Sequence, residues 1–197
     1  MTAKTTPRLP LLTREQMSPE AVELLDKLVI NDGGKVRKRT PDDPVSPFYG
    51  AVLQAPRLFK DWSWLGGALL RPGGLPVRDR ELVCLRTAWL CQGEMEWGNH
   101  VVIAHDIGMT PEEIERITHG PDRPEWSARD RAVLRGVDEL HFQGTLLDPT
   151  WAALAAVYDA QQLIEYLMLV GNYHTTAYVQ NALRIPLEEG IGGLDSR

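Results

Sequence analysis

The sequence predicts an all-α fold with a central helix-turn-helix unit and an N-terminal arm. Apolar residues recur at three- and four-residue steps through most of the chain, no segment alternates with period two, and no hairpin signal is evident. With 197 residues, 43% of them hydrophobic, the chain is long enough to bury a core of its own. These features favour one domain over two.

The first quarter of the chain differs from the rest in composition. Residues 1–19 carry proline, threonine and charge with little periodicity, which indicates an extended arm. Ser18 and Pro19 then supply an N-cap and a first helical position, and they predict a short helix ending at 31–34. From there to Pro47, glycine, proline and alternating charge favour a long surface loop. We therefore expect an arm, a short helix and a loop over 1–46, and the main domain over 47–197.

The main domain is predicted to be a succession of helices whose ends are marked by proline, glycine or capping residues. Gln92 and Gly93 form the turn of the central unit, and Gly108 is expected as a left-handed helix cap. The last helix is apolar almost all round, which indicates burial, for example at a subunit interface. The expected helices span 48–53, 56–70, 77–90, 94–107, 110–119, 127–144, a segment opening at Asp148, and 161–183.

Charge and cysteine content exclude several classes of protein. A formal net charge of -6 and a pI near 5.4 speak against a nucleic-acid surface, which needs clustered lysine and arginine. No run of 18 apolar residues and no leader pattern occur, so we expect a soluble cytoplasmic protein without a membrane partner. Cys84 and Cys91 lie about 10 Å apart along one predicted helix, too far for a disulfide. Both are expected to be reduced and buried.

The central unit carries the candidate acid-base residues. Glu96 and His100 are four residues apart, so they share a helix face, where the carboxylate could fix the imidazole tautomer and raise its pKa. An exposed stabilising pair would explain the same spacing. Glu81, in the helix before the turn, could fold back toward them and form a site with two carboxylates and one imidazole. Its place in the first turn of a helix also suits a favourable dipole interaction.

Other candidates are weaker. Trp97 could line a pocket or simply pack in the core. Tyr173 and His174 interrupt the apolar last helix, so they could line the same cleft or be satisfied within the core. A metal at the acid-base pair would lack a third ligand, because His105 lies about 140° further round the helix, and no HExxH pattern occurs. We therefore expect no metal site, and no serine lies in a nucleophile elbow.

Two stretches resemble the carboxymuconolactone decarboxylase family, which is related to the AhpD-type alkylhydroperoxidases. The first is RELVCLRTAWLCQGEMEWGNHVVIAHDIGMTPEEI, preceded by LLRPGGLP, and the second is RDRAVLRGVDELHFQGTLLDPTWAAL, followed by LIEYLMLVGNYHTTAYVQNAL. The resemblance spans about 47–187. It implies an AhpD-like helical bundle that forms trimers or hexamers, with active sites near subunit contacts, a small-molecule substrate and no metal or organic cofactor.

The resemblance also locates the thiols that this chain lacks. In the peroxidase branch a Cys-x-x-Cys precedes the histidine, and its two positions fall here on Gly93 and Glu96. Without these thiols the peroxide-reducing dithiol cycle has no resolving partner. The decarboxylase-like branch is similar in placing an acid at the second position, within a Glu-x-Glu-Trp pattern that here spans 94–97.

The resemblance therefore implies a thiol-free, cofactor-independent lyase, such as a decarboxylase, or an isomerase. His100 and Glu96 would form the acid-base pair, with Glu81 in support and Trp97, Tyr173 and His174 expected near the substrate. Two alternatives stay open. One is a peroxiredoxin-like antioxidant enzyme that reduces peroxides through Cys91, and the other is a non-catalytic oligomeric binding protein with the same fold.

Overall fold

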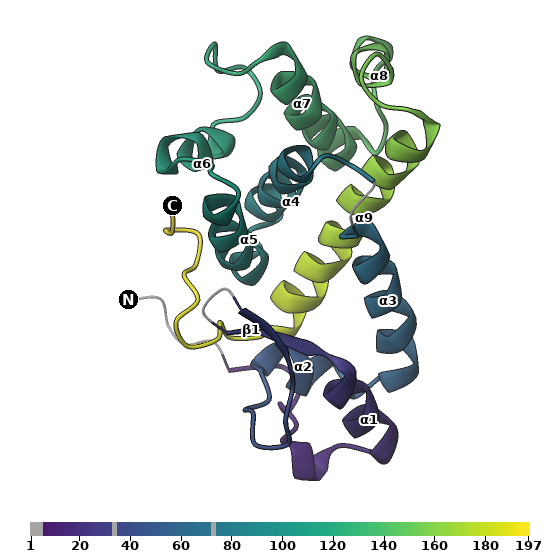
Figure 1. Ribbon diagram of the computed structural model, residues 1–197, viewed down its shortest axis with the longest axis vertical. Coiled ribbons are helices and arrows are strands. Elements are labelled where there is room, and N and C mark those ends of the chain that lie inside the picture. The colour runs from purple at the N-terminus through teal and green to yellow at the C-terminus, as the bar shows by residue number, and fades with distance from the viewer. Residues whose placement is uncertain (1–5, 33–34, 72–73) are drawn as a thin grey trace. The chain divides into compact units, whose positions relative to one another are not determined.

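A computed structural model describes residues 6–32, 35–71 and 74–197 (Figure 1). The all-α prediction is confirmed, since the described residues form nine α-helices and a single two-stranded sheet. No helix in this part of the chain is long and apolar enough to span a membrane. The helices are α1 (Pro19–Lys27), α2 (Pro47–Val52), α3 (Pro56–Leu69), α4 (Val77–Cys91), α5 (Glu94–Asp106), α6 (Pro111–Thr118), α7 (Ala128–Gln143), α8 (Asp148–Ala155) and α9 (Ala160–Leu183).

Helix ends follow the capping residues closely. Ser18 accepts a hydrogen bond from the backbone N–H of Ala21, and Thr110 forms a capping box with Glu113 at the start of α6. Gly108 has a φ of 87°, which confirms the predicted left-handed position after α5. Local sequence therefore sets most helix boundaries.

The chain divides into two compact units. One comprises residues 1–65 and 182–188, and the other comprises 66–181 and 189–197. In the first unit, the arm residue Arg8 donates its backbone N–H to the carbonyl of Leu183 at 2.9 Å, and Leu12 donates to Gly50 at 2.9 Å. The arm is thus bonded within its own unit. The helix-turn-helix region and the segments that surround it belong to the second unit.

A short antiparallel hairpin lies where a loop was expected. Strands β1 (Val29–Asp32) and β2 (Lys35–Lys38) pair with Asp32 opposite Lys35, and the preceding helix ends at Lys27. The prediction of a helix reaching 31–34 followed by irregular chain was therefore wrong. An Asp-Gly-Gly sequence between two short runs is a hairpin signal, but the charges of the second run hid it. Gly33 and Gly34 themselves lie outside the described residues.

Helix α4 is the core of the second unit and packs against α5, α6 and α7. Its side chains are buried over most of its length, including those of polar residues. A buried charge needs polar partners, and the guanidinium of Arg86 has four. It donates to both carboxylate oxygens of Asp138 at 2.6 and 2.9 Å and to the backbone carbonyls of Ile117 and Thr118. This arginine joins α4 to α6 and α7.

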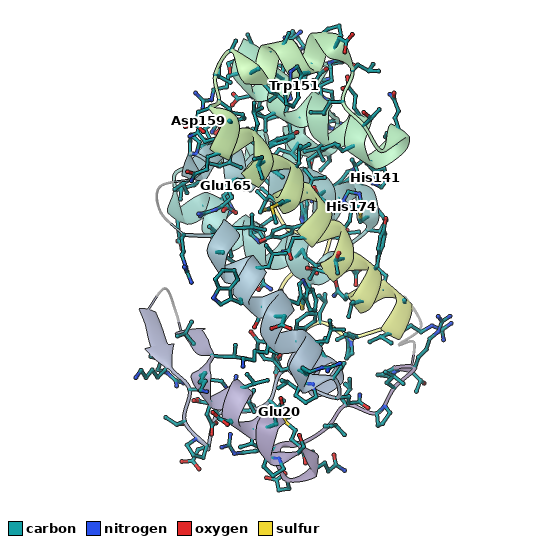
Figure 2. All side chains as sticks on the ribbon, turned by 90° about the vertical axis from the view of Figure 1, so that its right-hand side faces the viewer. Glu20, His141, Trp151, Asp159, Glu165 and His174 are labelled. Atoms are coloured by element: carbon teal, nitrogen blue, oxygen red, sulfur yellow. The ribbon has the colours of Figure 1, made fainter. Side chains whose placement is uncertain are left out.

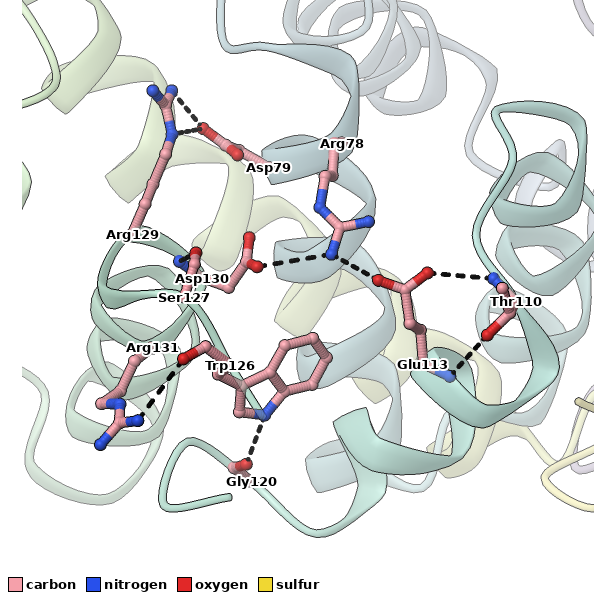
Figure 3. Close-up of polar contacts among 10 residues, drawn as sticks. All are labelled: Arg78, Asp79, Thr110, Glu113, Gly120, Trp126, Ser127, Arg129, Asp130 and Arg131. Atoms are coloured by element: carbon pink, nitrogen blue, oxygen red, sulfur yellow. Dashed lines mark hydrogen bonds and ion pairs between the residues drawn. The ribbon is translucent and has the colours of Figure 1, made fainter. Parts of the chain in front are cut away.

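Charged side chains at the start of α4 add further links (Figure 3). Arg78 lies between Glu113 of α6 and Asp130 of α7, at 2.8 and 3.4 Å. Asp79 is buried and accepts hydrogen bonds from Arg129 at 2.6 Å and from the hydroxyl of Tyr158 at 2.6 Å. Because these contacts satisfy both charges, the first turn of α4 is held in place, and Glu81 follows directly.

Candidate active site

The turn between α4 and α5 positions the two helices that carry the candidate acids. Gln92 adopts a left-handed φ of 55°, which reverses the chain after Cys91. Two amides of α9 bond both sides of the turn: Asn181 donates to the Cys91 carbonyl at 2.7 Å, and Gln180 accepts a backbone N–H from the first turn of α5 at 3.3 Å. These bonds satisfy free helix-end groups and fix the turn against α9.

Three helices contribute to a buried hydrogen-bonded row. Glu81 of α4 contacts Nδ1 of His100 on α5 through Oε2 at 2.5 Å, and Nε2 of His100 faces the hydroxyl of Tyr173 on α9 at 2.6 Å. The second oxygen of Glu81 accepts from Nε of Arg80 at 3.1 Å. Glu81 is fully buried and His100 is 6% exposed. The structure thus brings the predicted Glu81, His100 and Tyr173 together.

The electrostatics of this row favour an ion pair. Burial raises the pKa of Glu81, but the contacts with His100 and Arg80 outweigh it and hold the pKa below its usual value. Burial lowers the pKa of His100, whereas Cys84 and Glu81 outweigh it and raise the pKa. At neutral pH His100 is therefore an imidazolium that donates from Nδ1 to Glu81 and from Nε2 to the oxygen of Tyr173.

Cys84 belongs to this site, although from the sequence alone we expected only a buried apolar residue there. It is free and fully buried, and it interacts with His100 and Tyr173 strongly enough to affect the pKa of both. The spacing offered a signal, because Cys84 lies three residues after Glu81 and so on the same face of α4.

Glu96 lies beside this row without joining it. It is 3% exposed, and neither carboxylate oxygen has a hydrogen-bond partner in the described part of the chain. Burial raises the pKa of Glu96 to about 7, while its own backbone N–H and the charge of His100 act in the opposite direction. The sequence led us to expect Glu96 as the hydrogen-bond partner of His100, but Glu81 takes that position. Glu96 is therefore a buried acid that changes protonation near neutral pH.

The carboxylate of Glu96 points back toward the turn. A Cβ atom added at Gly93 would lie 2.6 Å from Oε2 of Glu96 and 3.3 Å from Cβ of Ala177. A side chain at position 93 would therefore displace the Glu96 carboxylate, whereas the φ of -85° at Gly93 would itself admit any residue. The resemblance assigns the thiols of the peroxidase branch to positions 93 and 96. In this chain they hold a glycine and a buried acid, and the carboxylate of Glu96 occupies the space beside Gly93.

The remaining predicted residues lie elsewhere. Trp97 is fully buried, donates its indole N–H to the carbonyl of Ser196 at 2.9 Å and packs against Trp89 with ring centroids 5.3 Å apart. This position favours the core-packing interpretation of Trp97. His174 is half-buried and contacts His141, not His100.

The described residues form a helical protein in which Glu81, His100 and Tyr173 are buried together, and one known family matches the region that carries the two acids. The carboxymuconolactone decarboxylase family profile matches residues 56–139, a region that contains Glu81, Glu96 and His100. The match covers less than half of the chain, and over these residues it agrees with the resemblance found in the sequence. A comparison with curated proteins gave no match.

Solved structures share the fold at low sequence identity. An uncharacterised peroxidase-related protein from Ralstonia eutropha with an AhpD core is 14% identical, with a TM-score of 0.74 and 95% of each chain covered. An AhpD-type protein of unknown function from Agrobacterium tumefaciens is 19% identical, with a TM-score of 0.64, covering 70% of this chain and 94% of the other. A debrominase in complex with 2,3,4-tribromopyrrole is 13% identical, with a TM-score of 0.64 and 95% of each chain covered. At these identities the likeness shows an AhpD-like fold.

Proposed function

We propose that this protein is a cofactor-independent acid-base enzyme of the decarboxylase-like branch, a lyase or isomerase acting on a small carboxylated or lactone substrate. The observation that carries the proposal is the state of Glu96, a buried carboxyl group that has no hydrogen-bond partner among the described residues and whose pKa is raised to about 7. A general acid or base works best when its pKa lies near the working pH. The adjacent His100 supplies a fixed positive charge.

The chemistry follows from these two groups. In a decarboxylation the bond to the carboxylate carbon breaks, CO₂ leaves, and the electron pair stays on a carbon conjugated with the lactone carbonyl. Protonated Glu96 donates its proton to that carbon and regains one from solvent. His100 stabilises the negative charge that develops, and Glu81 keeps the imidazole charged and oriented. In an isomerisation, ionised Glu96 removes a proton from one carbon and returns it to another.

A peroxide-reducing enzyme is the second candidate, because the structural relatives include peroxidase-related proteins. That reaction needs a nucleophilic thiolate and a resolving thiol. Burial, aided by the charge of Glu96, raises the pKa of Cys91 to about 11, so this thiol stays protonated at neutral pH. The second thiol position holds Glu96. Both features support acid-base chemistry over peroxide reduction.

The two candidates are separated by assays on the same variants. Carboxymuconolactone and related carboxylated lactones are incubated with the protein in D₂O, and CO₂ release and deuterium incorporation into the product are measured. Glu96→Gln should lower turnover by about 100-fold or more, the range for loss of a general acid. Glu94→Gln is the matched control, because Glu94 is exposed and lies two residues away.

Unchanged turnover in Glu96→Gln would overturn the proposal. Peroxide consumption with a thiol reductant that is abolished by Cys91→Ser, without turnover of any lactone, would select the peroxidase. If neither reaction occurred and Glu96→Gln left the affinity for every lactone unchanged, a non-catalytic binding protein would be the correct description. The oligomeric state, which the resemblance puts at trimer or hexamer, is measured by light scattering on the same samples.

A further inference from the structure

A second group of polar side chains lies where α4, α7 and α9 meet. Cys91 ends α4, His141 lies near the end of α7, and His174 lies in the second half of α9, so 50 and 33 residues separate them in the sequence. Figure 2 shows His141 and His174 facing each other from their two helices. One ligand atom from each of the three residues lies within 4.8 Å of the others, and all three residues are half-buried.

The hydrogen bonding of His174 fixes which ring nitrogen faces the cluster. Its Nδ1 lies 2.8 Å from the carbonyl oxygen of Val170. A carbonyl only accepts, so Nδ1 carries the proton and Nε2 carries a lone pair. Nε2 in turn lies 2.9 Å from Nδ1 of His141. Metal-binding histidines are commonly oriented in this way, with the distal N–H donated to a backbone carbonyl.

A single proton lies between the facing ring nitrogens of His141 and His174. Since Nε2 of His174 accepts, the proton between the two rings belongs to Nδ1 of His141. The sulfur of Cys91 lies 3.8 Å from the same nitrogen. A cation placed there would take over the position of this proton, which would move to Nε2 of the same ring. The thiol proton would be released to solvent, so that a thiolate and two neutral imidazoles face the ion.

The geometry points to a metal site, and we propose that Cys91 Sγ, His141 Nδ1 and His174 Nε2 bind a zinc ion. Zinc bond lengths and tetrahedral angles require about 3.3 Å between two ligand nitrogens and about 3.6 Å between sulfur and nitrogen. The distances of 2.9 and 3.8 Å differ from these values by a few tenths of an ångström, and the third pair, Cys91 Sγ and His174 Nε2, lies within 4.8 Å. Rotation of the side chains would bring the three atoms to zinc geometry.

The ligand set and the surroundings favour zinc over other ions. One sulfur and two imidazole nitrogens suit zinc, whereas magnesium and calcium prefer oxygen ligands. Exposed aromatic residues flank the two histidines: Phe142 packs edge-on against His141, and Tyr178 against His174. The ion can therefore arrive from solvent, and water can take the fourth position. This site departs from the metal-free expectation drawn from the sequence.

The test uses Co²⁺ as a spectroscopic probe and Zn²⁺ as the competing ion. The full-length protein is stripped of metal with a chelator and titrated with Co²⁺. A tetrahedral site with one thiolate should give visible d–d bands and a near-ultraviolet sulfur-to-cobalt band, and stoichiometric Zn²⁺ should remove both. Cys91→Ser should abolish the sulfur band, and Cys91→Ser, His141→Ala and His174→Ala should each weaken Zn²⁺ binding by about 100-fold or more.

His119→Ala is the matched control, because His119 pairs with Glu115 on another part of the same unit. It should bind both ions like the wild type. Absence of the tetrahedral spectrum in the wild type would refute the site without any variant. A sulfur band that persists in Cys91→Ser, or equal Zn²⁺ affinity in wild type and both histidine variants, would also refute it. Circular dichroism on each variant establishes that it is folded. Each of the three ligand variants then tests separately whether its residue binds the ion.

Discussion

Replacing Glu96 by glutamine should change how the stability of the protein depends on pH. Glutamine keeps the shape of the side chain and removes its ionisation. Burial raises the pKa of Glu96 from its ordinary 4.5 to about 7 in the folded protein. Each pKa unit corresponds to about 1.36 kcal/mol, so ionised Glu96 costs the folded state about 3 kcal/mol relative to the unfolded chain.

Because the pKa of Glu96 is raised in the folded protein, its ionisation makes the protein less stable as the pH rises. Below pH 4.5 the carboxyl is protonated in both states and contributes no difference. Between pH 4.5 and about 7 the unfolded chain loses the proton first, so the folded state loses stability as pH rises, and above about 7 the cost is complete. The glutamine variant has no such dependence at this position. Other titrating groups are common to both proteins and cancel in the comparison.

The assay is urea unfolding of wild type and Glu96→Gln at pH 4 and pH 8. The free energy of unfolding of the wild type, minus that of the variant, should fall by about 3 kcal/mol between these pH values. Glu94→Gln, at an exposed position, should follow the wild type. Parallel pH profiles for wild type and Glu96→Gln would refute the claim that Glu96 is a buried acid with a raised pKa.

Three further substitutions test the surroundings of the site. Tyr173→Phe leaves Nε2 of buried His100 without its partner and should lower the free energy of unfolding by about 1–3 kcal/mol; a variant as stable as the wild type in urea would contradict the hydrogen bond. Gly93→Ala places a Cβ 2.6 Å from the Glu96 carboxylate, so it should cost about 1–2 kcal/mol more in the wild type than in Glu96→Ala. Additive losses in that double-mutant cycle would show that the two residues do not touch. Arg86→Met removes a buried guanidinium, so the half-buried carboxylate of Asp138 on α7 and two α6 carbonyls lose their donor; it should cost about 3 kcal/mol, seen as a lower Tm, and an unchanged Tm would argue against the ion pair.

Local sequence was enough for the helices of the second unit. The predicted spans 77–90 and 94–107 differ by one residue at their ends from α4 (Val77–Cys91) and α5 (Glu94–Asp106). Proline, glycine and capping residues act within one helical turn, so their effect can be read without knowing the fold. The β1–β2 hairpin was missed because its pairing joins residues whose charges obscure the alternation along the strands.

The partners of the site residues could be predicted only in part. Helical spacing placed Glu96 and His100 on one face, and the turn at Gln92 made the approach of Glu81 plausible. Spacing did not show that Glu81, rather than Glu96, bonds the imidazole, nor that Tyr173 lies on its other nitrogen. Those contacts depend on how α4, α5 and α9 pack, which involves pairs separated by 19 and 73 residues.

By itself, the sequence determined most of the helices and the resemblance to the family, and it supplied the candidate acid-base residues, because each rests on residue types at short, fixed spacings. Only the tertiary structure decided the protonation states. Whether Glu96 is an ordinary acid or one with a pKa near 7 depends on removal of water and on the absence of a partner among the described residues. The same holds for Cys91, His141 and His174, which converge only because three helices cross at one place. Burial and long-range packing, which no short sequence pattern encodes, thus shift the pKa of Glu96 and bring Cys91, His141 and His174 together.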